Sequence, residues 1–112
     1  MIFHIAHVAD WVAAADLGEY RVASLDSEGF IHLSTRDQVL VTAGRYYSGV
    51  ESIALLAIDE SKLDSTLLRY EVSTGGEAFP HYYAGIPVGA VVGAHTFASG
   101  PDGEFLWPSE FA

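Results

Sequence analysis

An imidazole and a hydroxyl stand two residues apart in the octet Glu28-Gly29-Phe30-Ile31-His32-Leu33-Ser34-Thr35. Side chains two apart in a β-strand project from the same face, so His32 and Ser34 are expected together on one face. Ile31 and Leu33 would anchor the opposite face in a core. A neutral imidazole donates from one ring nitrogen and accepts at the other, so His32 is a candidate acid, base or hydroxyl-binding group. The alternative is a half-buried histidine bonded to the backbone.

Two further segments carry charged or aromatic side chains that could complete such a site. Arg69 and Glu71 project from the same face of a predicted strand and could bind a phosphate and polarise a hydroxyl, or be solvated surface charges. In the segment Phe79-Pro80-His81-Tyr82-Tyr83, Tyr83 could stack on a ligand ring and His81 could contact a pyrophosphate. The same segment could equally be a loop held down by its buried aromatic rings.

Helix capping competes with site chemistry at the end of the octet. Thr35 and Gln38 have the spacing of a capping box, so Thr35 is expected to cap a helix rather than to bind a ligand. Because that residue already provides the cap, Ser34 remains open between a capping role and a ligand-binding role.

Periodicity and cap residues predict the elements that would position these groups. Residues 2–7 alternate and predict a first strand, from which His4 is expected to face away from the core. Asp10 is the predicted N-cap of a short helix that ends at Gly18. Residues 19–29 are expected to be irregular.

After the octet, the pattern predicts a longer helix followed by three strands. The predicted elements are a helix over about 36–48 closed by Gly49, a central strand over 52–58, a turn or a single helical turn over 59–63, a strand over 67–72, a functional loop from 75 to about 87, and a strand over 88–97. The helix rests on the spacing of Val39, Ala43, Tyr46 and Tyr47.

Glycines and aromatic residues mark the last part of the chain. Gly89 and Gly93 interrupt the final predicted strand and are candidate bulges or close-approach points. After a turn at 101–103, the apolar residues Phe105, Leu106 and Trp107 are expected to pack back onto the body of the protein.

Length and composition predict one α+β domain over residues 1–112. Half of the 112 residues are hydrophobic, which is enough to bury a core without covalent staples. The chain has no cysteine, which excludes disulfides, a thiolate nucleophile and a cysteine-containing zinc site. Several strands and only two good helices, without regular βαβ alternation, are typical of the α+β class.

Charge and hydropathy limit the possible partners. Fifteen acidic residues against five basic ones give a net charge of −10, so we expect no large nucleic-acid footprint, although one or two arginines could hold a small anionic ligand. Neither a leader pattern nor a membrane-length apolar run is present, and we expect a soluble cytoplasmic protein. The histidine spacing matches no established zinc pattern, so we expect no metal.

Four segments together resemble a small bacterial family, the domain-of-unknown-function family 952, which is similar in outline to the ADP-ribosyltransferase superfamily. The segments are Phe3-His4-Ile5-Ala6, the octet, Leu68-Arg69-Tyr70-Glu71 and Phe79-Pro80-His81-Tyr82-Tyr83. The resemblance covers nearly the whole chain. It implies a bent, split, mostly antiparallel sheet with two main helices.

In the RNA 2′-phosphotransferase branch of that superfamily, motifs of the type His-Gly-Thr and His-Leu-Ser supply two histidines to an NAD site. By resemblance, His4 takes the first position and His32 the second. Ile5 and Ala6 depart from the Gly and Thr of the first motif. Glu71 lies broadly where many superfamily members carry a catalytic glutamate.

The resemblance therefore implies a small nucleotide-like ligand, NAD or a related ADP-ribosyl compound, in a histidine-lined cleft, with possible cleavage of the nicotinamide–ribose bond. The catalytic candidates are His4, His32 and Glu71, and the ligand-binding candidates are Ser34, Arg69, His81 and Tyr83. One alternative is a non-catalytic nucleotide-binding or protein-interaction module. Another is a hydrolase that acts on a different small substrate through a histidine pair.

Overall fold

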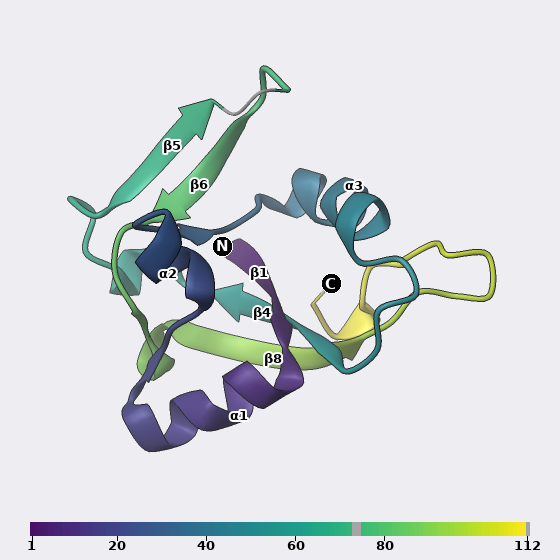
Figure 1. Ribbon diagram of the computed structural model, residues 1–112, viewed down its shortest axis with the longest axis horizontal. Coiled ribbons are helices and arrows are strands. Elements are labelled where there is room, and N and C mark those ends of the chain that lie inside the picture. The colour runs from purple at the N-terminus through teal and green to yellow at the C-terminus, as the bar shows by residue number, and fades with distance from the viewer. Residues whose placement is uncertain (73–74, 112) are drawn as a thin grey trace.

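Antiparallel sheets and two main helices make up the computed structural model, which describes residues 1–72 and 75–111 (Figure 1). In chain order the elements are β1 (Ile2–His7), α1 (Val8–Leu17), β2 (Glu19–Tyr20), α2 (Ala23–Ser27), β3 (Ile31–His32), α3 (Arg36–Tyr46), β4 (Ile53–Ile58), the 3₁₀ turn η1 (Glu60–Lys62), β5 (Leu68–Val72), β6 (Ala78–Tyr82), β7 (Ile86–Pro87), the 3₁₀ turn η2 (Val88–Ala90), β8 (Val91–Phe97) and η3 (Ser109–Phe111). The predicted α+β class is confirmed.

The central strand β4 lies between β1 and β8 and is buried along its whole length. Alternate side chains of β4 enter two separate cores. Leu56 and its neighbours on one face pack in the core that also contains Tyr20 and Tyr82. Leu55 and its neighbours on the other face pack with Val39 of α3 and Phe105 of the C-terminal tail. An unbroken apolar run therefore marks a strand covered on both faces, as predicted.

The same two-sided burial makes the predicted orientation of His4 wrong. Phe3 and Ile5 belong to the core that faces α3, whereas Ile2 and Ala6 belong to the opposite core. His4 shares the face of Ile2 and Ala6, and it is buried rather than turned to solvent. Alternation of residue types cannot distinguish a solvent-facing side from a second core.

Strand β1 runs directly into α1, which moves the start of that helix. His7 is the N-cap in place of the predicted Asp10, which lies in the first turn, where a negative charge favours the helix dipole. Gly18 ends the helix as predicted, with φ of 78° and its N–H donating to the carbonyl of Ala14 at 2.9 Å. The segment 19–29, predicted to be irregular, contains β2 and α2.

Helix α3 begins at the predicted capping box. The side-chain oxygen of Gln38 accepts from the backbone N–H of Thr35 at 3.0 Å. The helix ends at Tyr46, short of the predicted residue 48, because Tyr47 already has non-helical backbone angles, and Gly49 lies in the turn beyond. Tyr46 is 68% exposed, so it does not belong to the predicted apolar face.

The predicted loop over residues 75–87 is wrong, since it contains β6 and β7. Three glycines and two prolines in this segment are typical of a loop, but β6 is the middle strand of a sheet in the order β3-β6-β5. The carbonyl of Pro80 accepts from the N–H of Leu33 at 2.9 Å, so the backbone of Pro80 faces the segment that follows β3. Proline has no N–H to donate, and it is tolerated at this position because β3 has already ended there. Strand β3 itself is shorter than the octet, and Ser34 beyond it forms an isolated bridge with Phe3.

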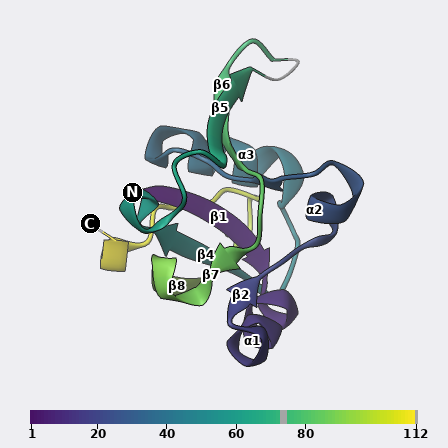
Figure 2. The same ribbon diagram turned by 90° about the vertical axis from the view of Figure 1, so that its left-hand side faces the viewer.

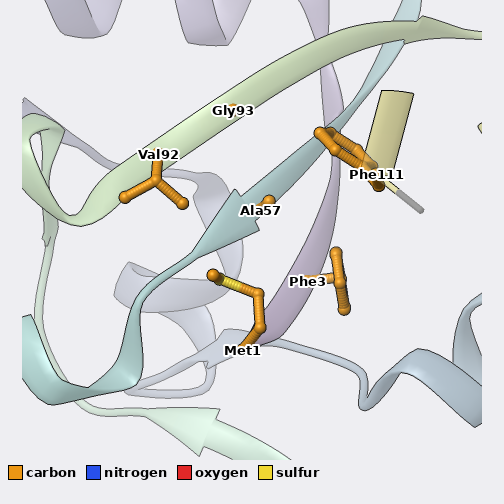
Figure 3. Close-up of a pocket in the computed structure, with 6 residues that line it drawn as sticks. All are labelled: Met1, Phe3, Ala57, Val92, Gly93 and Phe111. Atoms are coloured by element: carbon orange, nitrogen blue, oxygen red, sulfur yellow. The ribbon is translucent and has the colours of Figure 1, made fainter.

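The last strand and the tail depart from prediction at particular residues. Residues 88–90 form η2, so β8 begins at Val91 and Gly89 lies outside it. Gly93 is a close-approach point, because a Cβ there would lie 2.8 Å from the ring of Phe111. Figure 3 shows both residues at a small apolar hollow of about 130 Å³. In the tail, Phe105 and Trp107 pack onto the body as predicted, whereas Leu106 is 82% exposed.

Candidate functional site

Strands β3, β6 and β5 carry three of the predicted site residues in one row. His32 pairs with His81 across β3 and β6, and His81 pairs with Arg69 across β6 and β5. Residues directly opposite one another in neighbouring antiparallel strands project from the same face. The sheet thus brings together side chains that are far apart in the sequence.

Residues two positions away extend this row, because side chains of a strand alternate between faces. Glu71 follows Arg69 on this face, Tyr83 follows His81 just beyond the end of β6, and Phe30 precedes His32. We call this set the imidazole face: Phe30, His32, Arg69, Glu71, His81 and Tyr83. Tyr82 and Ile31, on the opposite face, belong to the hydrophobic core.

Glu71 is the hub of the polar contacts on the imidazole face. Its Oε1 accepts a hydrogen bond from the Tyr83 hydroxyl and another from Nδ1 of His81 at 2.9 Å. These two bonds, the tyrosine bond first, lower the pKa of the Glu71 carboxyl, and the bond to Glu71 raises the pKa of the Tyr83 hydroxyl. Near neutral pH, Glu71 is therefore a carboxylate and Tyr83 a neutral phenol. Because a carboxylate only accepts, Nδ1 of His81 carries a proton.

Aromatic stacking fixes the imidazole of His81. The ring of Phe30 lies on that of His81, with centroids 4.1 Å apart and planes inclined by 19°. Phe30 also contacts the rings of His32 at 4.8 Å and Tyr83 at 5.3 Å. The side chain of His81 is only 9% exposed as a result. Stacking on Phe30 and the hydrogen bond to Glu71 thus fix the orientation of the His81 ring.

His32 and Arg69 are the polar residues of the imidazole face that are exposed, whereas Glu71 and Tyr83 are half-buried. The His32 side chain is 54% exposed, and its ring centroid lies 5.3 Å from that of His81. Its Nε2 contacts Oε2 of Glu28 at 2.9 Å. The guanidinium of Arg69 lies 5.2 Å from the centre of the Tyr83 ring. His32 and His81 therefore each contact a carboxylate that orients the ring, and the guanidinium of Arg69 lies on the same face.

His4 approaches this site from the interior. Its Nδ1 lies 2.6 Å from the backbone oxygen of His32, and its Nε2 lies 2.9 Å from the hydroxyl of Tyr20. A carbonyl only accepts, so Nδ1 carries the proton and Nε2 accepts from the tyrosine. Burial lowers the pKa of His4 to about 4, which keeps the ring neutral. His4 therefore contacts the backbone of β3 and not the exposed side chain of His32.

The remaining candidate, Ser34, has a structural contact, whereas two residues that were not predicted, Glu28 and Phe30, contact His32. Ser34 is buried and exchanges two backbone hydrogen bonds of 2.8 Å with Phe3, which joins the end of the octet to β1. Sequence reasoning did not identify Glu28 and Phe30 as site residues. Their positions were available as signals, because Phe30 shares strand parity with His32, and Glu28 lies four residues before it.

Within residues 1–72 and 75–111, no group of three or more His, Asp or Glu side chains is placed to hold a metal ion. In the same ranges, no helix has the length and apolar character needed to cross a bilayer.

Comparison with known proteins relates the chain to a family and to one solved fold. A family model described as "Protein of unknown function (DUF952)" matches residues 5–94. The sequence in the crystal structure of protein CC0527 from Caulobacter crescentus is 33% identical to this chain. The match covers 94% of this chain and 92% of the CC0527 chain, with a TM-score of 0.85. The solution NMR structure of CC0527 is 34% identical, with coverages of 92% and 89% and a TM-score of 0.79. None of the curated proteins matches the chain.

Proposed function

The chain belongs to the DUF952 family, and we propose that it binds NAD or a related ADP-ribosyl compound on the imidazole face and cleaves the nicotinamide–ribose bond. One observation carries this proposal. Two carboxylate-oriented histidines, a carboxylate, a phenol and an arginine gather on one face, although they come from three strands. The relationship to ADP-ribosyltransferases and the cytoplasmic location belong to the same proposal and rest on the sequence.

The imidazole face offers a suitable group for each part of such a ligand. The exposed guanidinium of Arg69 can pair with a pyrophosphate. The half-buried rings of Phe30 and Tyr83 can stack on a planar base. The accessible imidazole of His32 can bind a ribose hydroxyl. Both internal bonds of Glu71 end on Oε1, so among the described residues Oε2 is the oxygen left for a second hydroxyl.

Glu71 and His32 would supply the chemistry. Departure of nicotinamide leaves positive charge on the ribose, as in glycoside hydrolysis, and a fixed carboxylate nearby stabilises it. The bonds that lower the pKa of Glu71 keep it ionised for this task. His32 would take the proton of the hydroxyl or water that adds to the ribose carbon, since an imidazole serves as a base near neutral pH. Its bond to Glu28 orients the ring.

His4 would act as a positioning residue rather than as a ligand contact. It holds the backbone oxygen of His32 at 2.6 Å and is itself held by Tyr20. The paired contacts link the core to the strand that carries the exposed imidazole. Loss of His4 would therefore disturb the site through the backbone of β3.

A non-catalytic nucleotide-binding module is the second candidate, and one feature favours it. Glu71 is engaged by Tyr83 and His81 at once, and His81 is covered by Phe30. A carboxylate held by internal partners is suited to a rigid recognition surface as well as to catalysis. The two candidates share the ligand and differ only in turnover.

Binding is tested first by calorimetric titration with NAD, ADP-ribose and, as an unrelated nucleotide, GTP. We expect NAD and ADP-ribose to bind and GTP to bind more weakly. Arg69→Gln should lower the affinity by about tenfold or more, because a desolvated phosphate contact is lost. Arg45→Gln, in the last turn of α3, is the matched control and should leave the affinity unchanged. Failure of every adenine nucleotide to bind would refute both candidates.

Turnover is tested by measuring nicotinamide release from NAD, with and without added acceptor alcohols. His32→Ala should reduce the rate on the order of 10²-fold or more, as for a lost acid or base. His7→Ala, which removes another exposed histidine at the end of β1, should leave the rate unchanged. If NAD binds to the wild type without release of nicotinamide under any of these conditions, the binding module replaces the enzyme.

A further inference from the structure

Strand β5 forms an edge of the β3-β6-β5 sheet and presents its outer side to solvent. Among the described residues, β6 is the one strand that pairs with β5. Figures 1 and 2 both show the β5–β6 hairpin standing out from the body, with β5 on its outer side in Figure 1. An exposed edge strand offers a row of backbone donors and acceptors to another chain.

The register shows which backbone groups of β5 point outwards. The carbonyl of Pro80 accepts from Leu33 of the β3 segment, so the backbone of Pro80 faces away from β5. Its partner Tyr70 is therefore in a non-hydrogen-bonded pair, and the Tyr70 N–H and C=O point to the outside. The alternation of the ladder gives Leu68 and Val72 the same direction. These three residues can form a new antiparallel ladder.

The face of this edge that carries Tyr70 and Val72 lacks the usual protection against pairing, whereas the charges of Arg69 and Glu71 lie on the other face. Charged or proline residues normally blunt an exposed edge. On one face of β5, Tyr70 is 51% exposed and Val72 is 69% exposed. Apolar groups are therefore available beside the outward backbone groups.

The sequence of β5 is complementary to itself. In Leu68-Arg69-Tyr70-Glu71-Val72, antiparallel pairing about Tyr70 sets Arg69 opposite Glu71 of a second copy, and Glu71 opposite the Arg69 of that copy. On the other face, Leu68 meets Val72, and the two Tyr70 rings meet each other. The Arg–Glu pairs fall at non-hydrogen-bonded positions, where opposite side chains are closest.

We propose that β5 is a self-association strand, which pairs with β5 of a second copy about a twofold axis at Tyr70. The pairing extends the three-stranded sheet into a six-stranded one, with the same surface used by both copies. The net charge of −10 on each copy opposes unspecific association, whereas this register places two opposite-charge pairs at the contact. Because Arg69 and Glu71 lie on the imidazole face, the pairing brings the two imidazole faces side by side, and the second copy and the proposed ligand compete for these two side chains.

Sedimentation equilibrium over a protein concentration series tests the proposal without any ligand. We expect a reversible monomer–dimer equilibrium, because one strand pair is smaller than the interface of a permanent complex. Val72→Lys should weaken dimerisation by tenfold or more. The matched control is Val12→Lys in α1, where the valine is 63% exposed, and it should have no such effect. A wild-type protein that stays monomeric throughout, or equal effects of the two substitutions, would overturn the proposal.

Charge reversal tests the register. Arg69→Glu places like charges opposite one another and should weaken the dimer by tenfold or more. The double variant Arg69→Glu/Glu71→Arg restores opposite charges and should return to within about threefold of the wild type. If circular dichroism shows that the double variant does not fold, the comparison of Val72→Lys with Val12→Lys tests the proposal instead. A folded double variant that dimerises no better than the single one would rule out this register.

Amide hydrogen exchange supplies a residue-level check on the wild type. The amides of Leu68, Tyr70 and Val72 should become protected as the protein concentration rises. Those of Arg69 and Glu71 already face β6 and should be protected at every concentration. Protection that does not follow this alternation would contradict pairing through the outer edge of β5.

Discussion

Lowering the pH from 7 towards 4 should destabilise the folded protein through the buried imidazole of His4. Both ring nitrogens are bonded, Nδ1 to the backbone oxygen of His32 and Nε2 to the hydroxyl of Tyr20. Protonation would add a donor at Nε2, where the present partner donates. It would also place a charge in the core, which is why burial lowers the pKa of His4 from 6.5 to about 4.

The magnitude follows from the difference between the folded and unfolded pKa. Between pH 6.5 and about 4, the unfolded chain binds a proton at His4 and the folded protein does not. The free energy of unfolding therefore rises with pH in this window, by slightly more than about 1 kcal/mol per pH unit. The contribution is complete above pH 6.5 and is lost by about pH 4. In total it amounts to about 3 kcal/mol.

Urea denaturation at pH 7.0, 6.0, 5.0 and 4.5 measures this effect. His4→Asn keeps a donor for the His32 carbonyl and cannot be protonated. The variant should be less stable at pH 7, because the bond from Tyr20 is lost, but the decline of its stability with falling pH should be shallower. The carboxylates that titrate at lower pH are the same in both proteins. The difference between the two curves of stability against pH therefore reports the titration of His4. Parallel stability curves for the wild type and His4→Asn would refute the reasoning.

Three further substitutions test packing and capping by equilibrium unfolding. Thr35→Ala should lower the free energy of unfolding by about 0.5–2 kcal/mol through loss of the capping box, while NAD affinity stays largely intact; a collapse of affinity at unchanged stability would make Thr35 a site residue. Gly93→Ala should displace the ring of Phe111, whose Cε1 lies 2.8 Å from the new Cβ, so it should cost less in a Phe111→Ala background than in the wild type. Trp107 has a buried Nε1 without a hydrogen-bond partner among the described residues; Trp107→Phe removes that donor and should cost clearly less than the about 3–5 kcal/mol typical of truncation of a buried aromatic to Ala.

Local patterns predicted several features of the fold correctly. The start of α3 follows from the spacing of Thr35 and Gln38, because a capping box involves only residues within one helical turn. The burial of β4 follows from its unbroken apolar run. Strand parity also predicted that Arg69 and Glu71 share a face, since alternation is a property of any extended strand.

The errors arise where distant segments decide the outcome. The prolines and glycines of residues 75–87 are typical of a loop, yet β6 forms there because β3 and β5 offer their edges on both sides. Pro80 is tolerated because its nitrogen points to where β3 ends, and only the register shows this. The start of α1 moved to Val8 because β1 leads into it without a turn.

The sequence by itself determined the α+β class, the central strand, the main helix and the residue types from which a site could be built. Only the tertiary structure decided that His81 joins His32 in one row with Arg69, whereas His4 lies in the core behind the strand of His32. The physical reason is that strand parity places a side chain on one of two faces but does not say what covers that face. A second core covers the His4 face of β1, and the pairing of β3, β6 and β5 creates the imidazole face.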